Sequence, residues 1–472
     1  MNIKKYNISY KWIAMSVVSM GIFMGTLDMG AMRVALPHLE QVFETGPDNV
    51  VWVSLIWLLT GSSLMLAMGR IGDIFGRKKL FTLGMAIFTL GLILCSLAQN
   101  LTQLIAFRFI QSFGAALNIS IQYAILTASF PSNERGKAIG IMGAVAGLGL
   151  LSGPALGGFF LDLLGWRSIF YLRIPFGIVS FVMAWVLLKE QTPLRRAEKF
   201  DLPGAIIFSS ALTCLILAMN RSQSFGWTSP WILTLGIAGV LLLILFLLVE
   251  KRAEYPLLDL GIFRNRLLST ASASHILFYM STSSANFLLP FYLIQAIGFS
   301  ASSAGLLLVL IPALNLMVAP LSGRLSDKLG SVFLCSSGLM MVSLALFMLS
   351  GLQITASLSQ IILYLVMLGI GMGLFIAPNT SAIMGGVAST RLGSASAMIG
   401  TLRQLGMSFG LALTGSVFTA SQLSYSDGLT SQGLLPDIIE KLSTVGGFQN
   451  AIFVALGVAA TGFLISMFRG KN

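Results

Sequence analysis

Two opposite charges lie in one long apolar run near the start of the chain, Asp28 and Arg33 in the stretch LDMGAMRVALP. A charge in a bilayer core costs roughly 2.5–3.5 kcal/mol on insertion scales, so each charge needs a partner or a task. A carboxyl group in such surroundings can bind and release a proton, which makes Asp28 a candidate proton carrier; a structural ion pair, with Arg108 as a possible partner, is the alternative. The two residues lie about 140° apart around a regular helix, so we expect them to have different partners.

Three roles are open to Arg33. It can pair with Asp162 near the end of another apolar segment, extend its charge towards the membrane surface, or attract an anionic or zwitterionic group of a ligand. Arg173, a second arginine near the end of an apolar segment, suits the last role as well. Under that hypothesis, replacing either arginine by Asn shifts ligand preference towards cations.

Polar and aromatic side chains recur in the other apolar segments and are candidates to line a cavity. They are Gln111, Asn118, Gln122, His275, Tyr279, Asn286, Tyr292, Asn315, Asn379, Arg403 and Gln404. His275 can titrate near neutral pH, although a hydrogen-bonded structural histidine explains it equally well.

The composition is typical of a membrane protein with many spans. Of the 472 residues 56% are hydrophobic and 10% are charged, whereas a soluble protein of this length carries about 25% charged residues. The cysteines, Cys95, Cys214 and Cys335, all lie in apolar runs, which indicates small buried side chains and no disulfide. With two histidines in the chain we expect no metal site. The sequence has no G-x-x-x-x-G-K-[ST] motif and no loop with an acid–histidine constellation, which argues against ATP-driven transport and against a membrane enzyme.

Apolar segments long enough to cross a bilayer recur along the chain. We expect about fourteen helices, at 12–33, 50–69, 79–98, 102–123, 137–160, 166–188, 202–219, 231–249, 269–295, 303–322, 332–352, 358–379, 394–420 and 447–468. A long loop over 421–446 is expected before the last helix. If the N-terminus is cytoplasmic, 22 of the 29 Lys and Arg residues fall on the cytoplasmic side. This asymmetry favours an even number of helices and two cytoplasmic termini.

Two predicted loops share the motif G-R-[I/L]-x-D-x-x-G. GRIGDIFGRKK (69–79) follows the second predicted helix, and GRLSDKLG (323–330) follows the tenth. Their equivalent positions imply two halves related by duplication in parallel orientation. We therefore divide the chain into an N-terminal six-helix bundle (1–199), a two-helix insert (200–250) and a C-terminal six-helix bundle (251–472). The loop residues expected to act in conformational switching are Gly69, Arg70, Asp73, Gly76, Arg77, Gly323, Arg324 and Asp327.

A third motif, GLLSGPALGG, places small residues at helical spacing, namely Gly149, Gly153, Gly157 and Gly158. Small residues allow another helix to pack closely, and Pro154 removes a backbone hydrogen bond and kinks the helix. A close-packed, kinked helix suits a surface on which two bundles rock. Ordinary small-residue packing without such a role is the alternative.

These motifs resemble those of the major facilitator superfamily, specifically its fourteen-helix drug:proton antiporter branch. GRIGDIFGRKK matches the signature loop between helices 2 and 3, and GLLSGPALGG matches the helix 5 antiporter motif. RFIQSFGAA (108–116) resembles the helix 4 motif, with Ser112 where Gly is usual. PLLDLGIFRNRLL (256–268) and LRQLGMSFG (402–410) resemble segments of helices 9 and 13. The resemblance implies an all-α polytopic membrane protein in which Arg108 lies near Asp28 and modulates proton coupling there.

Besides Ser112, three positions depart from the pattern of that branch. Arg33 and Arg173 stand where Asn is usual, and Gly30 stands where Thr is usual. The two arginines add positive charge near the expected mouth of the cavity.

The resemblance implies a secondary active transporter that exports amphipathic or drug-like compounds by proton antiport with alternating access. The alternative, which Arg33 and Arg173 favour, is a dedicated exporter or flippase of an anionic lipid, fatty acid or metabolite. Under either function we expect no enzymatic activity and no cofactor, with the proton gradient, or Na⁺ in its place, as the energy source. We also expect a monomer in the cytoplasmic membrane of a prokaryote, with both termini in the cytoplasm. Its partners would be a small-molecule or lipid-like substrate and the bilayer, with no nucleic acid.

Overall fold

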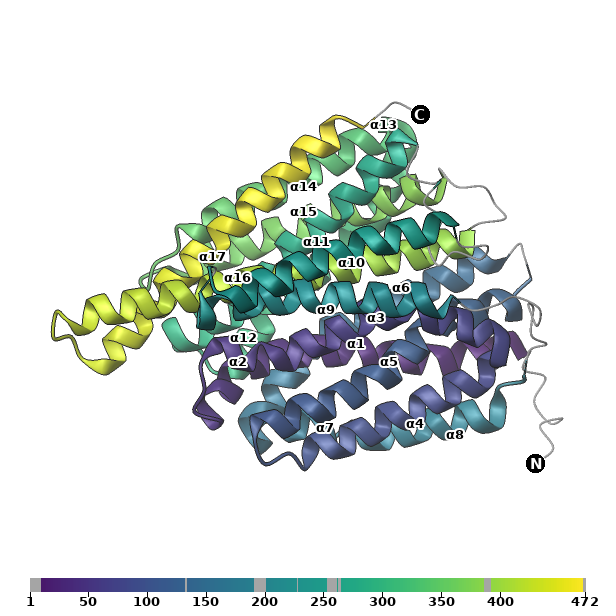
Figure 1. The fold of residues 1–472 in the computed structure, drawn as a ribbon, viewed down its shortest axis with the longest axis horizontal. Helices are drawn as coiled ribbons and strands as arrows, with labels where there is room; N and C mark the ends of the chain where they lie inside the picture. Colours follow the sequence, from purple (N-terminus) through teal and green to yellow (C-terminus); the bar gives the residue numbers. More distant parts are fainter. Residues whose placement is uncertain are drawn as a thin grey trace.

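The computed structural model describes residues 10–131, 134–190, 201–226, 228–252, 261, 265–385 and 392–469. Over these ranges the chain is built from helices and their connections, with no strand, so the predicted all-α fold is confirmed (Figure 1). In chain order the elements are α1 (Tyr10–Val42), α2 (Pro47–Val50), α3 (Trp52–Phe75), α4 (Arg77–Ser96), α5 (Leu101–Ser129), α6 (Arg135–Leu164), α7 (Ser168–Tyr171), α8 (Ile174–Leu187), α9 (Leu202–Phe225), α10 (Pro230–Arg252), α11 (Arg266–Phe291), the π-helical turn η4 (Tyr292–Ala296), α12 (Ala301–Leu308), α13 (Leu310–Leu329), α14 (Ser331–Ser350), α15 (Leu358–Gly385), α16 (Leu392–Thr430) and α17 (Pro436–Met467).

The helices provide the fourteen membrane-spanning segments that the sequence predicts. Within the described residues, 12 spans are long and apolar enough to cross a bilayer. α11 and α16 are also long but less apolar. In α11 the Ser281 and Thr282 hydroxyls donate to Phe278 O at 3.0 and 2.8 Å. α11 therefore tolerates polar residues, because it packs among α15, α16 and α17 and because the hydroxyl groups of its polar residues bond to its own backbone.

The start of α1 and the end of α17 lie at the same end of the bundle (Figure 1). We call this the Tyr10 end, and the opposite end, where α1 finishes, the Val42 end. This arrangement fits the even number of spans that the Lys and Arg distribution predicts.

One predicted loop is in fact helical. α16 continues to Thr430 and α17 begins at Pro436, so the expected 421–446 loop is wrong, and the two helices form a hairpin that projects at the left of Figure 1. At ~1.5 Å per residue, the 39 residues of α16 span about 58 Å, nearly twice the ~30 Å hydrocarbon core. The hydropathy pattern did not predict this extension, because its residues are polar. Contacts between the two helices stabilise the hairpin, including a hydrogen bond from Gln422 Nε2 to Thr444 Oγ1 at 3.2 Å.

The segment predicted as one helix at 166–188 is broken into α7 and α8. Pro175 lies in the first turn of α8, where its missing N–H leaves no hydrogen bond unmade. The same proline prevents one continuous helix from running through α7 and α8. Arg173 occupies the break as the residue before α8, and this position directs its side chain into the N-terminal bundle.

The internal repeat has a structural counterpart. Gly76 ends α3 with φ 106°, and Gly330 ends α13 with φ 84°. Both glycines close the motif G-R-[I/L]-x-D-x-x-G, and both N–H groups bond to the residue four positions earlier, Gly72 O and Ser326 O. Only glycine adopts these dihedrals without strain, which explains its place at the same point of both copies. The division of the chain into two bundles and an insert stays a prediction.

The remaining switch residues have different surroundings. Arg77 Nη1 donates to Ala124 O at 3.1 Å, which ties the start of α4 to α5. Gly323 and Arg324 lie in the last turns of α13, with Arg324 exposed. The other four, Gly69, Arg70, Asp73 and Asp327, have side chains outside the described residues.

Two helices, α6 and α9, pack against helices of both predicted bundles. α6 packs against α1 on one side and α12 on the other, and α9 packs against α3, α16 and α10. α6 and α9 therefore cover two of the seams along which the halves meet.

Candidate functional site

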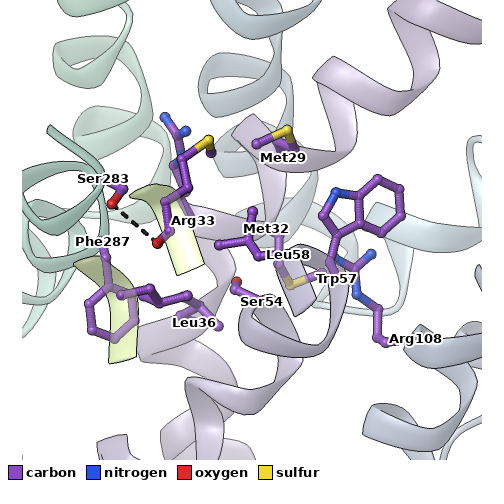
Figure 2. A pocket seen from close by; sticks show the side chains of 12 residues that line it. Met29, Met32, Arg33, Leu36, Ser54, Trp57, Leu58, Arg108, Ser283 and Phe287 are labelled. Carbon is purple, nitrogen blue, oxygen red and sulfur yellow. Dashed lines mark hydrogen bonds between the residues drawn. The ribbon is translucent and has the colours of Figure 1, made fainter. Parts of the chain in front are cut away.

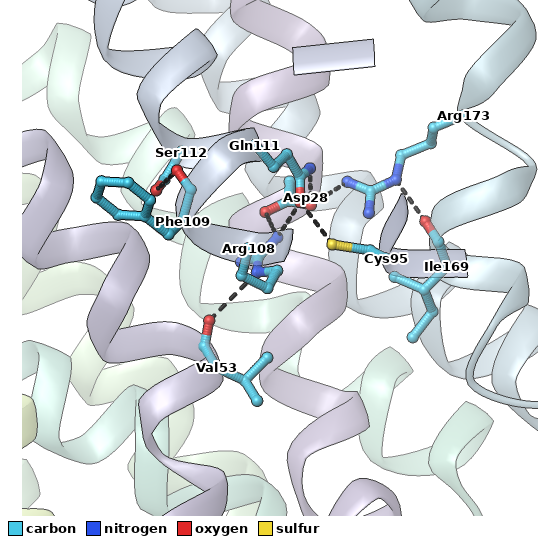
Figure 3. Close-up of polar contacts among 9 residues, drawn as sticks. All are labelled: Asp28, Val53, Cys95, Arg108, Phe109, Gln111, Ser112, Ile169 and Arg173. Atoms are coloured by element: carbon cyan, nitrogen blue, oxygen red, sulfur yellow. Dashed lines mark hydrogen bonds and ion pairs between the residues drawn. The ribbon is translucent and has the colours of Figure 1, made fainter. Parts of the chain in front are cut away.

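Asp28 is completely buried and accepts hydrogen bonds from three side chains (Figure 3). Arg108 Nη1 lies 2.8 Å from Asp28 Oδ2, and Arg173 Nη1 lies 2.5 Å from Asp28 Oδ1. Gln111 Nε2 adds a bond of 3.2 Å to Oδ1. One carboxylate thus faces two guanidinium groups, and the cluster carries a net charge of +1.

Backbone and aromatic groups orient both arginines. Arg108 Nε donates to Val53 O at 3.2 Å, and its guanidinium lies 4.9 Å from the ring centre of Trp57. Arg173 Nε donates to Ile169 O at 2.5 Å. Because these contacts hold the donors in place, proton binding at Asp28 competes with two charge-assisted hydrogen bonds.

A cavity of ≈ 50 Å³ lies beside this cluster, between the two halves (Figure 2). Its lining residues come from α1, α3, α5, α11 and α16: Met29, Met32, Arg33, Leu36, Ser54, Trp57, Leu58, Arg108, Ser283, Phe287, Met407 and Leu411. Drug-sized ligands occupy pockets of about 300–1,000 Å³, so the cavity must widen to admit one. Three unbranched Met side chains in the lining suit such repacking.

Arg33 is the charged group of this cavity that has no carboxylate partner among the described residues. Its Nη1 donates to Asn286 Oδ1 on α11 at 3.0 Å, which links the two halves through a neutral acceptor. Asn286 Nδ2 in turn donates to Thr282 O at 2.8 Å. A guanidinium in this setting can exchange its neutral acceptor for an anionic one.

The structure corrects two expectations about the arginines. Arg33 does not meet Asp162; Asp162 Oδ2 instead accepts from Ser302 N at 2.8 Å and Ser302 Oγ at 2.5 Å. Arg173 does not line the cavity, because the break before α8 turns it towards Asp28, and only 6% of its surface is exposed. Asp28 and Arg33 have separate partners, as their angular separation predicts.

The glycine-rich motif of α6 makes close contacts with α1. A Cβ atom added to Gly153 would lie 2.7 Å from Gly30 Cα, and one added to Gly157 would lie 2.6 Å from Ala31 Cα. A Cβ on Gly30 would lie 2.8 Å from Pro154 Cδ, so Gly30, a departure from the family pattern, is required by this contact. A side chain at Gly149 would meet Thr26 in the same way.

The other face of the motif contacts the C-terminal half. A Cβ on Gly158 would collide with Ala301 O, and one on Gly305 with Pro154 O. α6 is therefore packed backbone to backbone against α1 within its own half and against α12 across the seam.

Most other predicted cavity residues lie elsewhere. Asn118 Nδ2 contacts Met85 Sδ between α4 and α5, and Tyr292 OH donates to Gln353 O at 2.8 Å. Gln122 is buried in α5, and Arg403 is exposed on α16. Of the residues predicted to bind substrate, only Arg33 lines the central cavity, and Asn286 reaches it by bonding to Arg33.

His275 belongs to a separate buried cluster in the C-terminal half. Its Nδ1 lies 3.0 Å from Asn379 Nδ2, and its ring packs edge-on against Tyr279. Arg469 Nη2 donates to Asn379 Oδ1 and to Ser274 Oγ, the latter at 2.6 Å. Arg469 is one of the 22 basic residues that the sequence places on the cytoplasmic side, and no local signal marks it as buried.

The apolar lining of the central cavity was also missed. Trp57, Phe287 and the three methionines belong to runs in which lipid-facing and cavity-facing residues have the same composition. Only the rotation of each helix in the bundle separates the two groups.

The chain belongs to the Major Facilitator Superfamily, whose sequence profile matches residues 18–220 and 204–411. It is thus a multi-pass membrane transporter and not an enzyme. It is 34% identical over 421 residues to the riboflavin transporter RibZ of Clostridioides difficile, covering 89% of this chain and 91% of that one. It is 31% identical over 409 residues to the multidrug resistance protein Stp of Mycobacterium tuberculosis, covering 86% of this chain and 76% of Stp.

Solved structures share the fold. A bacterial homologue of the human lysosomal transporter Spinster, inward-facing and unoccupied, superimposes with a TM-score of 0.71 at 16% identity and 98% coverage of both chains. This similarity concerns the fold alone.

Proposed function

We propose that this protein belongs to the fourteen-helix drug:proton antiporter branch and exports amphipathic or drug-like compounds by proton antiport with alternating access. The observation that carries the proposal is the position of Arg108. Its guanidinium bonds to Asp28 and also lines the central cavity beside Trp57. A proton arriving at Asp28 and a ligand entering the cavity would therefore act on the same side chain.

The coupling follows from charge. When Asp28 is ionised, Arg108 and Arg173 are held against it. Protonation removes the negative charge and frees Arg108 to move, which changes the wall of the cavity. Substrate and proton would then favour opposite arrangements of Arg108, as exchange requires.

Alternating access needs a surface on which the halves move. The α6 motif packs against α12 across the seam, and Asp162 bonds to Ser302 near the Val42 end of that contact. We assign the rocking surface to this seam and the cytoplasm to the Tyr10 end. The named activities of two relatives also support drug export: Stp, and the tetracenomycin C resistance and export protein of Streptomyces glaucescens, which is 27% identical over 412 residues.

A second candidate is export or flipping of an anionic lipid, fatty acid or metabolite. The neutral partner of Arg33 favours it, since Asn286 leaves the guanidinium charge uncompensated in the cavity. Arg173 no longer contributes to this argument, because it is buried against Asp28 and does not line the cavity. The name of RibZ adds riboflavin to the compounds worth testing.

The test is transport in proteoliposomes with an imposed pH gradient. A lipophilic cation, a fatty acid, a zwitterion and riboflavin are each supplied to wild type, Asp28→Asn and Asp437→Asn. The control Asp437 is an exposed acid of the α16–α17 hairpin. We expect proton-coupled movement of the amphipathic compound in wild type and Asp437→Asn, and none in Asp28→Asn.

Asp28→Asn leaves two arginines without a carboxylate, so its folding is checked by downhill exchange of labelled substrate. We expect exchange to continue in this variant without proton movement. Proton-coupled transport at the wild-type rate in Asp28→Asn would refute the assignment. A wild-type protein that couples protons to the fatty acid but not to the cation would favour the second candidate.

A further inference from the structure

A second, larger cavity of ≈ 450 Å³ opens at the Val42 end of the N-terminal half. It lies between the end of α1, α2, the first turns of α3 and α5, and the end of α9. Its volume falls within the range of about 300–1,000 Å³ that small-molecule sites occupy. It shares no lining residue with the central cavity.

The cavity contains two opposite charges that do not pair with each other. Glu44 and Arg221 both line it, yet no ion pair joins them among the described residues. The hydrogen bond that Arg221 makes there is a long one, 3.4 Å from Nη1 to Asn49 Oδ1. Both charged groups are thus open to a ligand, and a molecule carrying both signs would satisfy them together.

Trp52 adds an unused donor to the wall of the same cavity. Trp52 is only 8% exposed, and its indole Nε1–H has no hydrogen-bond acceptor in the described part of the chain. A buried donor without an acceptor is costly, and a carboxylate or carbonyl of a ligand would remove that cost. The guanidinium of Arg221 lies 5.7 Å from the Trp52 ring centre, so the indole ring and the cation are neighbours in this cavity.

Glu44, which also lines the cavity, is held in an unusual backbone conformation. It has φ 47°, the one positive value of a non-glycine residue among those described. Helices commonly end with Gly or Asn in this conformation, because a longer side chain is strained there. Residues kept in such conformations cluster at ligand sites, and here the strained residue brings a carboxylate to the cavity.

We propose that this cavity binds a small zwitterion with an apolar body. Its carboxylate would bind Arg221 and the Trp52 indole N–H, its ammonium group would bind Glu44, and its body would pack on Phe43 and Ile105. Because Arg221 comes from α9, the first helix of the predicted two-helix insert, that insert completes the site. The proposal does not depend on the exported compound or on the coupling ion.

The test compares three probes with the same phenyl ring and different charges. L-phenylalanine carries both groups, 3-phenylpropionate lacks the ammonium group, and phenethylamine lacks the carboxylate. Binding of radiolabelled phenylalanine to the full chain in nanodiscs is measured by scintillation proximity, with the other two as competitors. We expect each competitor to bind at least tenfold more weakly than phenylalanine.

Variants assign each charge. Arg221→Gln is expected to weaken phenylalanine binding at least tenfold, so that phenylalanine no longer binds more tightly than phenethylamine. In Glu44→Gln, phenylalanine is expected to bind no more tightly than 3-phenylpropionate. Arg167→Gln is the matched control. Arg167 also lies at the Val42 end, but it donates to Ala98 O at 2.9 Å outside the cavity. This variant should bind phenylalanine as tightly as wild type.

Two results would overturn the proposal. One is the absence of phenylalanine binding by folded wild-type protein. The other is binding that Arg221→Gln and Glu44→Gln leave unchanged but Arg33→Asn removes, which would place the ligand in the central cavity.

Discussion

Replacing Gly153 by Ala tests whether the α6 motif acts through backbone contact. The added Cβ would lie 2.7 Å from Gly30 Cα and 2.8 Å from Leu27 O. Carbon atoms approach one another comfortably at about 3.5–4.0 Å, so α1 and α6 must separate by about 1 Å. Both atoms that the Cβ meets belong to backbone and cannot rotate away. Overpacking of this kind costs about 1–3 kcal/mol.

Gly143→Ala on the same helix is the matched control. A Cβ there meets nothing within 4 Å, so the substitution should stabilise the helix by about 0.5–1 kcal/mol. We therefore expect the two variants to differ by about 1.5–4 kcal/mol in the free energy of unfolding. Unfolding is followed by tryptophan fluorescence in detergent micelles, with heat and with denaturing detergent.

Transport separates a stability effect from a gating effect. Asp28 lies two residues before Gly30, so a shift of α1 should also disturb its bond to Arg108 and slow proton-coupled transport in Gly153→Ala. Equal stability and equal transport in Gly153→Ala and Gly143→Ala would show that α1 and α6 do not pack as described. The close-contact account of the motif would then fail.

Three further variants test separate contacts. Asn286→Asp places a carboxylate against Arg33 and should weaken the binding of anionic compounds at least tenfold in a competition assay. Asn286→Ala should bind the same compounds at least as well as wild type. Equal loss of binding in both variants would contradict the charge argument. Gly76→Ala forces a residue with φ 106° into strain and should lower the free energy of unfolding by about 1–2 kcal/mol, while Gly236→Ala, which has open space and ordinary dihedrals, should not. Asp162→Ala removes the hydrogen bonds to α12 and should increase the distance between α6 and α12 at the Val42 end, as measured by spin-label pairs; an unchanged distance distribution would show that this contact does not hold the seam closed.

The spans and the repeat were accessible to sequence reasoning because their causes are local. A run of about 20 apolar residues crosses a bilayer whatever its neighbours are. The glycine that ends each copy of the repeated loop motif is required by its own φ, as Gly76 and Gly330 show. The α16–α17 hairpin was missed for the complementary reason, since its helices beyond the bilayer depend on each other and carry no hydropathy signal.

The site was accessible only in part. Asp28 stands out because an acid in an apolar run is rare, and the family resemblance led to Arg108. The partner of Arg173 depends on the break before α8, and the partner of Arg33 lies 253 positions away on α11. Spacing along one helix excludes a shared face for Asp28 and Arg33, but it does not say which other helix each residue meets.

The amino-acid sequence by itself determined that this chain is a polytopic helical transporter with a duplicated loop motif, a glycine-rich α6 and one acid deep in the first helix. Those properties follow from hydropathy, backbone dihedrals and residue size, which act over a few residues. Tertiary structure alone decided that Arg173 joins Arg108 at Asp28, that Arg33 faces Asn286 and that Arg469 is buried. It also decided which of many apolar residues line a cavity, because helix rotation, kinks and the contact of the two halves set these partners over hundreds of residues.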